Sequence, residues 1–278
     1  MKNLLKLFTP PIVVNFIRKF KKPLENNNAI QWKGNYPSWA AAAAASEGYD
    51  QAVILKKVKA STLKVKTGEA VYERDSFIFD EKQYSWPLLA LLLKIAAEHG
   101  GQLNIIDFGG SLGSTYFQNR DFLHEAKIEL NWRVVEQAHF VKVGNEELSS
   151  KELSFYDTLK AATDNFDINV ILLSGVLQCI EYPDEVITLC KQLSVPNILV
   201  DRTAFVRDAN ERITVQHVPE WIYKASYPCR FFNEQKFIDY FSDTYHCEIS
   251  FDSFADIAIL SEDGKTFYWK GFYFTKKN

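Results

Sequence analysis

Two acidic residues and a group of glycines stand near the middle of the chain, in an order that suits the binding of a nucleotide-like ligand. Asp107 ends the short apolar run Leu103–Ile106, and a segment able to begin a helix starts at Ser114. Between them lie three glycines, Gly109, Gly110 and Gly113. A strand–turn–helix unit of this kind brings backbone N–H groups and a helix N-terminus close to the ligand. Glycine is needed there because a Cβ atom would block both the turn and the close approach.

The acid before this turn narrows the class of ligand. When the nicotinamide pattern G-x-G-x-x-G is aligned on Gly110 and Gly113, its first glycine is missing, because Asp107 and Phe108 stand before them. A carboxylate facing the loop suits a positively charged amino or sulfonium group and suits a pyrophosphate poorly. We therefore expect Asp107 and the three glycines to bind a nucleoside-type ligand that carries a positive group.

A second acid ends the next predicted strand. Glu136 closes the strand expected at Trp132–Glu136, 29 residues beyond Asp107. In nucleotide-binding sheets this position faces a ribose, and a carboxylate can accept hydrogen bonds from both of its hydroxyls. The spacing from the glycine turn makes Glu136 a predicted ligand of the cofactor.

Two further sheet positions are candidates for cofactor contacts. Asp157 follows a short strand predicted at Leu153–Tyr156, and it either contacts an adenine amino group or caps the helix predicted at Leu159–Ala162. Ser174 and Gly175 begin the loop after an apolar strand, at the sheet edge where ligands bind.

A polar cluster precedes the first core strand. It contains Tyr72, Glu73, Arg74 and Asp75. A guanidinium forks well onto a carboxylate, so Arg74 can bind a ligand that carries one. The alternative is a surface ion pair between Arg74 and either neighbouring acid, and the sequence leaves both open.

The residues expected to act on a second substrate lie later in the chain. Arg207–Phe232 is too long for a plain connection, and we interpret it as an insertion that binds the acceptor. His217 is the candidate general base, because its reference pKa lies near 6.5; alternatively it is a strand histidine bonded to backbone. Asp201 and Glu220 are the reserve bases. The expected acceptor contacts are Arg202, Tyr227 and Arg230.

Strands alternating with helices from about residue 101 predict a mostly parallel α/β sheet. The final segments Tyr245–Phe254 and Phe267–Thr275 predict an antiparallel hairpin that completes seven strands, one of them reversed. The predicted organisation is a basic amphipathic segment at 1–29, a helical cap at 30–100, and a Rossmann-like domain at 101–278 whose insertion covers about 204–232. Within the cap, Ser38 is the expected start of an alanine-rich helix that we expect to be buried.

Composition excludes some functions. The net charge of −3 argues against general nucleic-acid binding, and 47% hydrophobic residues predict a folded core. Neither zinc spacing nor paired cysteine motifs are present, so we expect reduced thiols, no metal and a cytoplasmic location. Residues 1–22 carry six basic residues and no acid. They form either a helix held at the inner membrane face or a terminal helix packed on the body; the oligomeric state is left open.

The stretch LNIIDFGGSLGS resembles motif I of the class I S-adenosylmethionine-dependent methyltransferases. Four further segments resemble a family of bacterial proteins classed as methyltransferases and associated with surface-polysaccharide genes: GNYPSWAAAAAASEGYD, YERDSF, LSGVLQCIEYP and YKASYPCRFF. The similarity runs over roughly residues 32–275. The loop after the fourth strand lacks the D/N-P-P-aromatic motif of enzymes that methylate amino nitrogens.

This resemblance implies a seven-stranded methyltransferase sheet, S-adenosylmethionine as the cofactor, and methyl transfer to a small molecule or glycan. It says little about the acceptor. A protein that keeps the fold for binding or assembly without turnover is the alternative. A nucleotide-sugar or nicotinamide enzyme is third, and Asp107 disfavours it.

Overall fold

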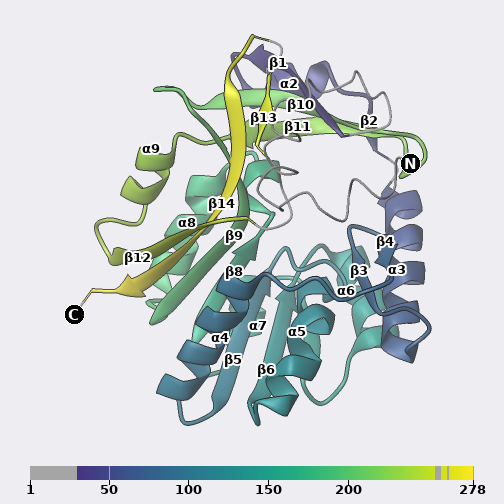
Figure 1. Ribbon diagram of the computed structural model, residues 1–278, viewed down its shortest axis with the longest axis vertical. Helices are drawn as coiled ribbons and strands as arrows, with labels where there is room; N and C mark the ends of the chain where they lie inside the picture. The colour runs from purple at the N-terminus through teal and green to yellow at the C-terminus, as the bar shows by residue number, and fades with distance from the viewer. Residues whose placement is uncertain (1–29, 50, 254–257, 262, 278) are drawn as a thin grey trace, which may run out of the picture.

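The computed structural model describes residues 30–49, 51–253, 258–261 and 263–277 (Figure 1). The expectations for residues 1–29, and for Asp50 as a helix cap, fall outside this range. Among the described residues no helix has the length and apolar character needed to cross a bilayer. No group of three or more metal-ligating side chains lies together in the same range.

One large sheet forms the centre of the molecule. In spatial order its strands are β12 (Tyr245–Asp252), β14 (Thr266–Lys276), β9 (Asn197–Val206), β8 (Val170–Ser174), β5 (Gln102–Phe108), β6 (Glu129–Val135) and β7 (Leu153–Tyr156). The pairs from β9 to β7 are all parallel. β14 runs antiparallel to both of its neighbours, and the short β13 (Ile259–Leu260) pairs with it as an eighth strand.

This topology confirms the predicted fold class, a mostly parallel α/β sheet with one reversed strand towards one edge. The reversed strand is β14, and β12 lies outside it as its hairpin partner. The order changes direction between β5 and β8, so the carboxyl ends of these two strands open a crevice at which ligands bind in such sheets.

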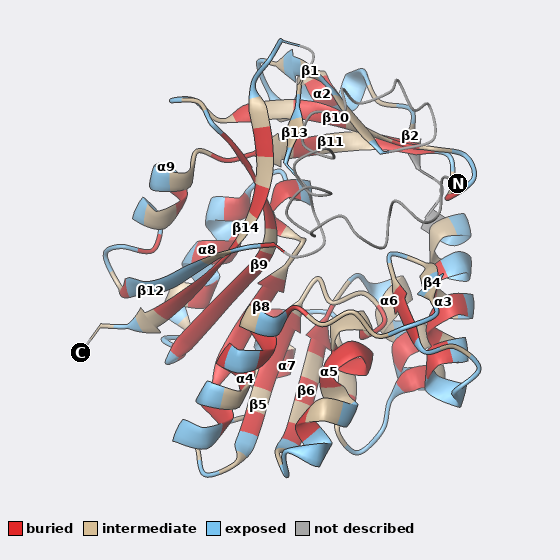
Figure 2. Ribbon diagram, viewed as in Figure 1, coloured by how far each residue is buried: buried red, intermediate tan, exposed pale blue. Residues whose placement is uncertain are grey.

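Helices cover both faces, and this explains why the central strands are apolar runs. α3 (Gln51–Thr67), α4 (Trp86–Glu98) and α5 (Ser114–Glu125) pack in the core on one face. α7 (Leu159–Thr163), α8 (Pro183–Gln192) and α9 (Glu234–Asp239) pack on the other face. Figure 2 shows the central strands as mostly buried. α6 (Ala138–Val143) follows β6 and continues into a π-helical turn, Gly144–Leu148.

A second sheet of four strands lies beyond the carboxyl ends of the large one (Figure 1). Its order is β1 (Gln31–Tyr36), β10 (Arg212–Val218), β11 (Ala225–Phe231) and β2 (Gly48–Tyr49), all antiparallel. The segment predicted as a helical cap therefore contains strands. The prediction missed them because β1 and β2 gain their hydrogen-bond partners from residues about 180 positions later, which no local pattern reveals.

The alanine-rich helix is correctly placed but wrongly described. Ser38 caps α2 (Trp39–Ala44) by accepting a hydrogen bond from the Ala41 N–H at 3.1 Å. Of its alanines only Ala42 is buried, so the predicted burial of the run is wrong. One face of α2 packs on the small sheet, and its other alanine side chains are not buried.

The polar cluster before the core folds into a hairpin, β3 (Tyr72–Arg74) with β4 (Phe77–Phe79). Its two turn residues, Asp75 and Ser76, have φ values of 51° and 71°. Two positive φ values in a two-residue connection define a turn whose twist matches that of the strands. Asn-Gly is the usual choice there, so this sequence holds Asp75 in a conformation with a steric cost.

Candidate functional site

The glycine turn lies between β5 and α5 and is shaped by close backbone approaches. Gly109 has a φ of 73°, and a Cβ at this residue would lie 2.3 Å from Cγ2 of Val176 in the loop after β8. Gly113, with a φ of 88°, occupies the N-cap of α5. A Cβ on Gly110 would meet the Asp107 carboxyl group at 2.5 Å. The turn therefore needs its glycines, as the sequence predicted.

Asp107 lies beneath this turn and is almost completely buried. Its Oδ2 accepts a hydrogen bond from the Trp132 indole at 3.0 Å, while Oδ1 has no hydrogen-bond partner among the described residues. Burial raises the pKa of Asp107 to about 7, and the charge of Glu136 adds to the shift. A buried carboxyl oxygen without a donor is costly and marks a place where a ligand donor would be stabilised.

Glu136 leaves the end of β6 and lines a cavity of about 540 Å³, which we call the acidic cavity. Burial raises the pKa of Glu136, and the N–H groups of Gln137 and Ser111 work against that rise. The contact with Ser111 brings Glu136 to the glycine turn. Its carboxylate thus lies beside the glycine turn, and its contact with a ribose stays a prediction.

Asp157 is exposed and lines the same cavity. The cap of α7 is its neighbour Thr158, whose hydroxyl accepts from the Ala161 N–H at 3.2 Å. The alternative role of Asp157 as that helix cap is therefore wrong. Gly109 and Gly175 complete the polar wall, and among the described residues lining this cavity there is no lysine or arginine.

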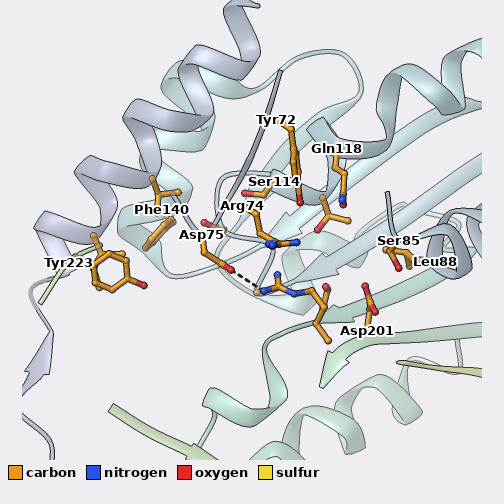
Figure 3. A pocket seen from close by; sticks show the side chains of 18 residues that line it. Tyr72, Arg74, Asp75, Ser85, Leu88, Ser114, Gln118, Phe140, Asp201 and Tyr223 are labelled. Carbon is orange, nitrogen blue, oxygen red and sulfur yellow. Dashed lines mark hydrogen bonds and ion pairs between the residues drawn. The ribbon is translucent and has the colours of Figure 1, made fainter. Parts of the chain in front are cut away.

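A second cavity, of about 200 Å³, lies on the other side of the glycine turn, and we call it the loop cavity (Figure 3). Gly109 lines both cavities, so they lie against the same turn. Four of the predicted site residues line it besides the glycines: Arg74, Ser174, Asp201 and Arg202. Ser174, the last residue of β8, is the register partner of Asp201 in the middle of β9, and Asp201 is 2% exposed.

An ion pair lies in the wall of the loop cavity. Nη2 of Arg202 donates to Oδ2 of Asp75 at 2.9 Å, joining the middle of β9 to the β3–β4 turn (Figure 3). Arg202 has a φ of 50°, so both partners are held in the left-handed region. Arg74 places its guanidinium 5.1 Å from the Phe79 ring centroid and lines the cavity. Asp75 is thus paired with Arg202, which the sequence did not predict.

Glu73 ties the hairpin to the glycine turn. Its carboxyl group accepts a hydrogen bond from the Ser114 hydroxyl at the start of α5, and burial raises its pKa to about 7. Sequence reasoning placed Glu73 only as a surface ion-pair partner. Ser114 lies 41 residues later in the chain, so the sequence gave no sign of this contact.

A third cavity, of about 340 Å³, lies between the hairpin and the small sheet, and we call it the aromatic cavity. It shares Arg74, Asp75, Arg202 and Tyr223 with the loop cavity, and it shares Gly175 with the acidic one. The predicted acceptor residue Tyr227 lines it. So do residues that sequence reasoning did not single out, namely Trp32, Phe77, Phe79, Gln178, Gln216 and Trp269.

Three predicted residues do not join the site. His217 and Glu220 line a separate hollow with Lys224 and Ser226. The reason is the alternation of side chains along β10: Gln216 faces the aromatic cavity, so its neighbour His217 faces away. These placements contradict the expected role of His217 as base and of Glu220 as reserve base.

Arg230 is also outside the three cavities. Tyr227 faces the aromatic cavity, and Arg230, an odd number of residues along β11, points to the opposite face. There its guanidinium donates to Glu211 and to the Glu181 carbonyl, both at 3.1 Å. The expected acceptor contact of Arg230 is therefore replaced by a structural ion pair.

Comparison with known proteins gives weak likenesses. No family model and no curated protein matches the chain. Among solved structures, the PH0226 protein from Pyrococcus horikoshii OT3 has 11% identity and a TM-score of 0.43, over 70% of this chain and 92% of that one. A protein from Sulfolobus solfataricus that is described as a type 11 methyltransferase has 15% identity and a TM-score of 0.41, over 69% of this chain and 92% of that one.

The N-terminal domain of EvdMO1, solved with SAH and D-fucose, has 12% identity and a TM-score of 0.43, over 83% of this chain and 98% of that one. Likenesses at these TM-scores carry no argument about ligand or reaction. The function proposed for this chain therefore depends on its own sheet topology and on the three neighbouring cavities, which share lining residues.

Proposed function

We propose that the protein is an S-adenosylmethionine-dependent methyltransferase that acts on a small molecule. The observation that supports this most is the distribution of charge over the two cavities that flank the glycine turn. The acidic cavity carries Glu136 and Asp157 without a basic side chain among its described lining residues. The loop cavity carries two arginines and two aspartates. A neutral ribose beside Glu136 and an amino-acid tail in the loop cavity match this order, whereas a pyrophosphate at the glycine turn would lie against the Asp107 carboxyl group.

The residues fit the cofactor piece by piece. Glu136 accepts from the ribose hydroxyls, and Asp157 lies on the side of the adenine. The backbone of the glycine turn and Arg74 hold the amino-acid part, with the Arg74 guanidinium on its carboxylate. The raised pKa of Asp107 and its oxygen without a partner favour a cationic group nearby. When bound, S-adenosylmethionine supplies a methyl group on a positively charged sulfur.

The acceptor enters through the aromatic cavity in this proposal, because Arg74, Asp75, Arg202 and Tyr223 border both it and the loop cavity. Holding the acceptor against the cofactor in one orientation supplies much of the rate of such a displacement. Asp201, in the middle of β9, is the remaining predicted base that lines the site. A glycan acceptor in surface-polysaccharide assembly rests on the sequence resemblance alone, and a cytoplasmic location rests on the cysteine pattern.

One observation favours the alternative, a binding or assembly protein without turnover. No histidine is among the described residues lining the three cavities, so a base with a pKa near neutrality is missing there. Such a protein would bind the cofactor and release no methylated product. Incubation with labelled S-adenosylmethionine and a panel of acceptors separates the two, because only the enzyme transfers label.

Calorimetric titration with S-adenosylhomocysteine tests the cofactor part. Glu136→Gln should weaken binding by about 1.5–3 kcal/mol, since a charged acceptor of ribose hydrogen bonds becomes neutral. The matched control is Glu129→Gln, at the opposite end of β6 and outside the cavities, which should bind like the wild type. Equal affinity of wild type and Glu136→Gln would contradict the assignment of the acidic cavity.

A further inference from the structure

We propose that the aromatic cavity binds an uncharged ring compound through a hydroxyl group held between Tyr223 and Asp75. This inference rests on the proposed function, because it names the class of acceptor that the same site takes. It is carried by a chain of hydrogen bonds with a fixed direction, by the charges that line the cavity, and by its apolar walls.

The chain of hydrogen bonds crosses three strands on one face of the small sheet. Trp32, Gln216 and Tyr227 are register neighbours on β1, β10 and β11. The Trp32 indole donates to Oε1 of Gln216 at 3.0 Å, and Nε2 of Gln216 donates to the Tyr227 hydroxyl at 2.9 Å. Tyr227 in turn is hydrogen-bonded to Tyr223.

The first member of this chain sets its direction. An indole N–H is only a donor, so it fixes which end of the Gln216 amide is the oxygen. The amide nitrogen then donates a hydrogen bond to the Tyr227 oxygen, and the Tyr227 hydroxyl donates one to the Tyr223 oxygen. The Tyr223 hydroxyl proton is left to point outward, at the border of the aromatic and loop cavities. Burial keeps Tyr223 protonated by raising its pKa to about 12, so it acts as a donor.

Asp75 supplies the complementary acceptor. It lines the same two cavities, and its charge acts on the Tyr223 hydroxyl. In Figure 3 the Tyr223 hydroxyl points to the side on which Asp75 lies. The Asp75–Arg202 ion pair engages one carboxylate oxygen, Oδ2. A group that accepts from Tyr223 and donates to Asp75 at once is a hydroxyl.

Other common groups fail this double requirement. A carboxylate or phosphate has no proton for Asp75 and is repelled by it. An ammonium group has no lone pair for the Tyr223 proton. A carbonyl oxygen accepts but does not donate.

The charges along the wall also favour an uncharged compound. Arg74, Asp75 and Arg202 are the charged residues among the described lining of the aromatic cavity. Asp75 neutralises Arg202 by direct contact, and the proposed function assigns Arg74 to the carboxylate of the cofactor. The cavity wall then has no unpaired charge that could offset the free-energy cost of removing a charged acceptor from water.

The remaining wall is suited to the flat face of a ring. The indoles of Trp32 and Trp269 lie with ring centroids 5.0 Å apart, and Phe77 and Phe79 face the cavity from the hairpin. Aromatic side chains bury large apolar areas. The hydrogen bonds among Trp32, Gln216 and Tyr227 satisfy the polar groups of this wall. A ring that carries hydroxyl groups at its rim matches both features.

Saturation-transfer NMR on the full chain tests this with a matched panel of ring compounds. The probes are cyclic alcohols, phenols and methyl glycosides, each beside the same ring carrying a carboxylate or an ammonium group. We expect the uncharged members to bind, and Tyr223→Phe to weaken them at least about fivefold. Tyr240→Phe, which removes a hydroxyl on the surface outside the cavities, should leave their binding unchanged. Preferential binding of the charged members, or no binding of the uncharged ones, would overturn the proposal.

A second variant keeps the proposal testable if Tyr223→Phe does not fold. Trp32→Phe keeps an aromatic wall but removes the donor that begins the chain, and we expect it to weaken the same compounds. Binding of S-adenosylhomocysteine by Tyr223→Phe should stay within about twofold of the wild type. If the wild type fails to bind S-adenosylhomocysteine, the proposed function falls; if it binds but Tyr223→Phe leaves ring affinity unchanged, only this inference falls.

Discussion

Asp107 and Glu73 are two carboxyl groups that burial holds in an uncommon protonation range. The pKa of each is raised to about 7, from 3.8 and 4.5 respectively. One lies beneath the glycine turn and the other bonds Ser114 at its far end. Both carboxyl groups therefore change protonation state near pH 7, and the stability of the protein should depend on pH in that range.

Asp107→Asn should change how stability depends on pH. The folded state keeps the Asp107 proton up to about pH 7, whereas the unfolded chain loses it near pH 4. The folded state thus binds more protons between these values, and stability falls as pH rises through this window. The variant should lack about 2 kcal/mol of the wild-type decrease between pH 5 and 7. Urea denaturation at both pH values measures it; identical decreases in the two proteins would show that Asp107 is ionised throughout.

At the scale of elements, the turn after β5 depends on the loop after β8. Gly109 combines a left-handed backbone with a close approach to Val176. Gly109→Ala should cost several kcal/mol, because strain and overlap add. Gly68→Ala has a similar φ but open space around its Cβ, and should cost only about 1–2 kcal/mol. Chemical denaturation compares them, and equal losses would mean that Val176 moves aside freely.

Elements with their own local signals were predicted well. The apolar run ending in Asp107, the acid Glu136 after the next strand, and Ser38 as a cap all lie where the pattern indicated. His217 was expected in the site but lies outside the three cavities, because a shift of one residue along β10 reverses the face that a side chain lies on, and the long-range pairing of β10 with β1 and β11 sets that face. The Asp75–Arg202 pair joins residues 127 positions apart, so no spacing could announce it.

At the scale of the whole molecule, β1 near the start of the described chain closes a sheet whose other strands come mostly from the late insertion. Trp32 on β1 packs against Phe231 of β11 and Trp269 of β14, at 6.1 and 5.0 Å between ring centroids. The aromatic cavity is therefore built from three distant parts of the sequence. The acidic cavity is lined from the loops that follow strands of the large sheet.

Trp32→Ala should affect these two cavities differently. Loss of a half-buried indole should lower the free energy of unfolding by about 2–3 kcal/mol. S-adenosylhomocysteine binding should remain, because Trp32 lines the aromatic cavity and not the acidic or loop cavities. Denaturation and calorimetry on one sample measure both. A loss of S-adenosylhomocysteine affinity with the fold intact would show that the two cavities are coupled.

The most direct test of the central claim is a paired calorimetric titration of the wild-type chain with S-adenosylhomocysteine and with NAD⁺. The acidic and loop cavities on either side of the glycine turn predict saturable binding of S-adenosylhomocysteine at one site and no measurable binding of NAD⁺, whose pyrophosphate would lie at the glycine turn above the Asp107 carboxyl group. Binding of NAD⁺ with none of S-adenosylhomocysteine would contradict the account and assign the crevice to a dinucleotide.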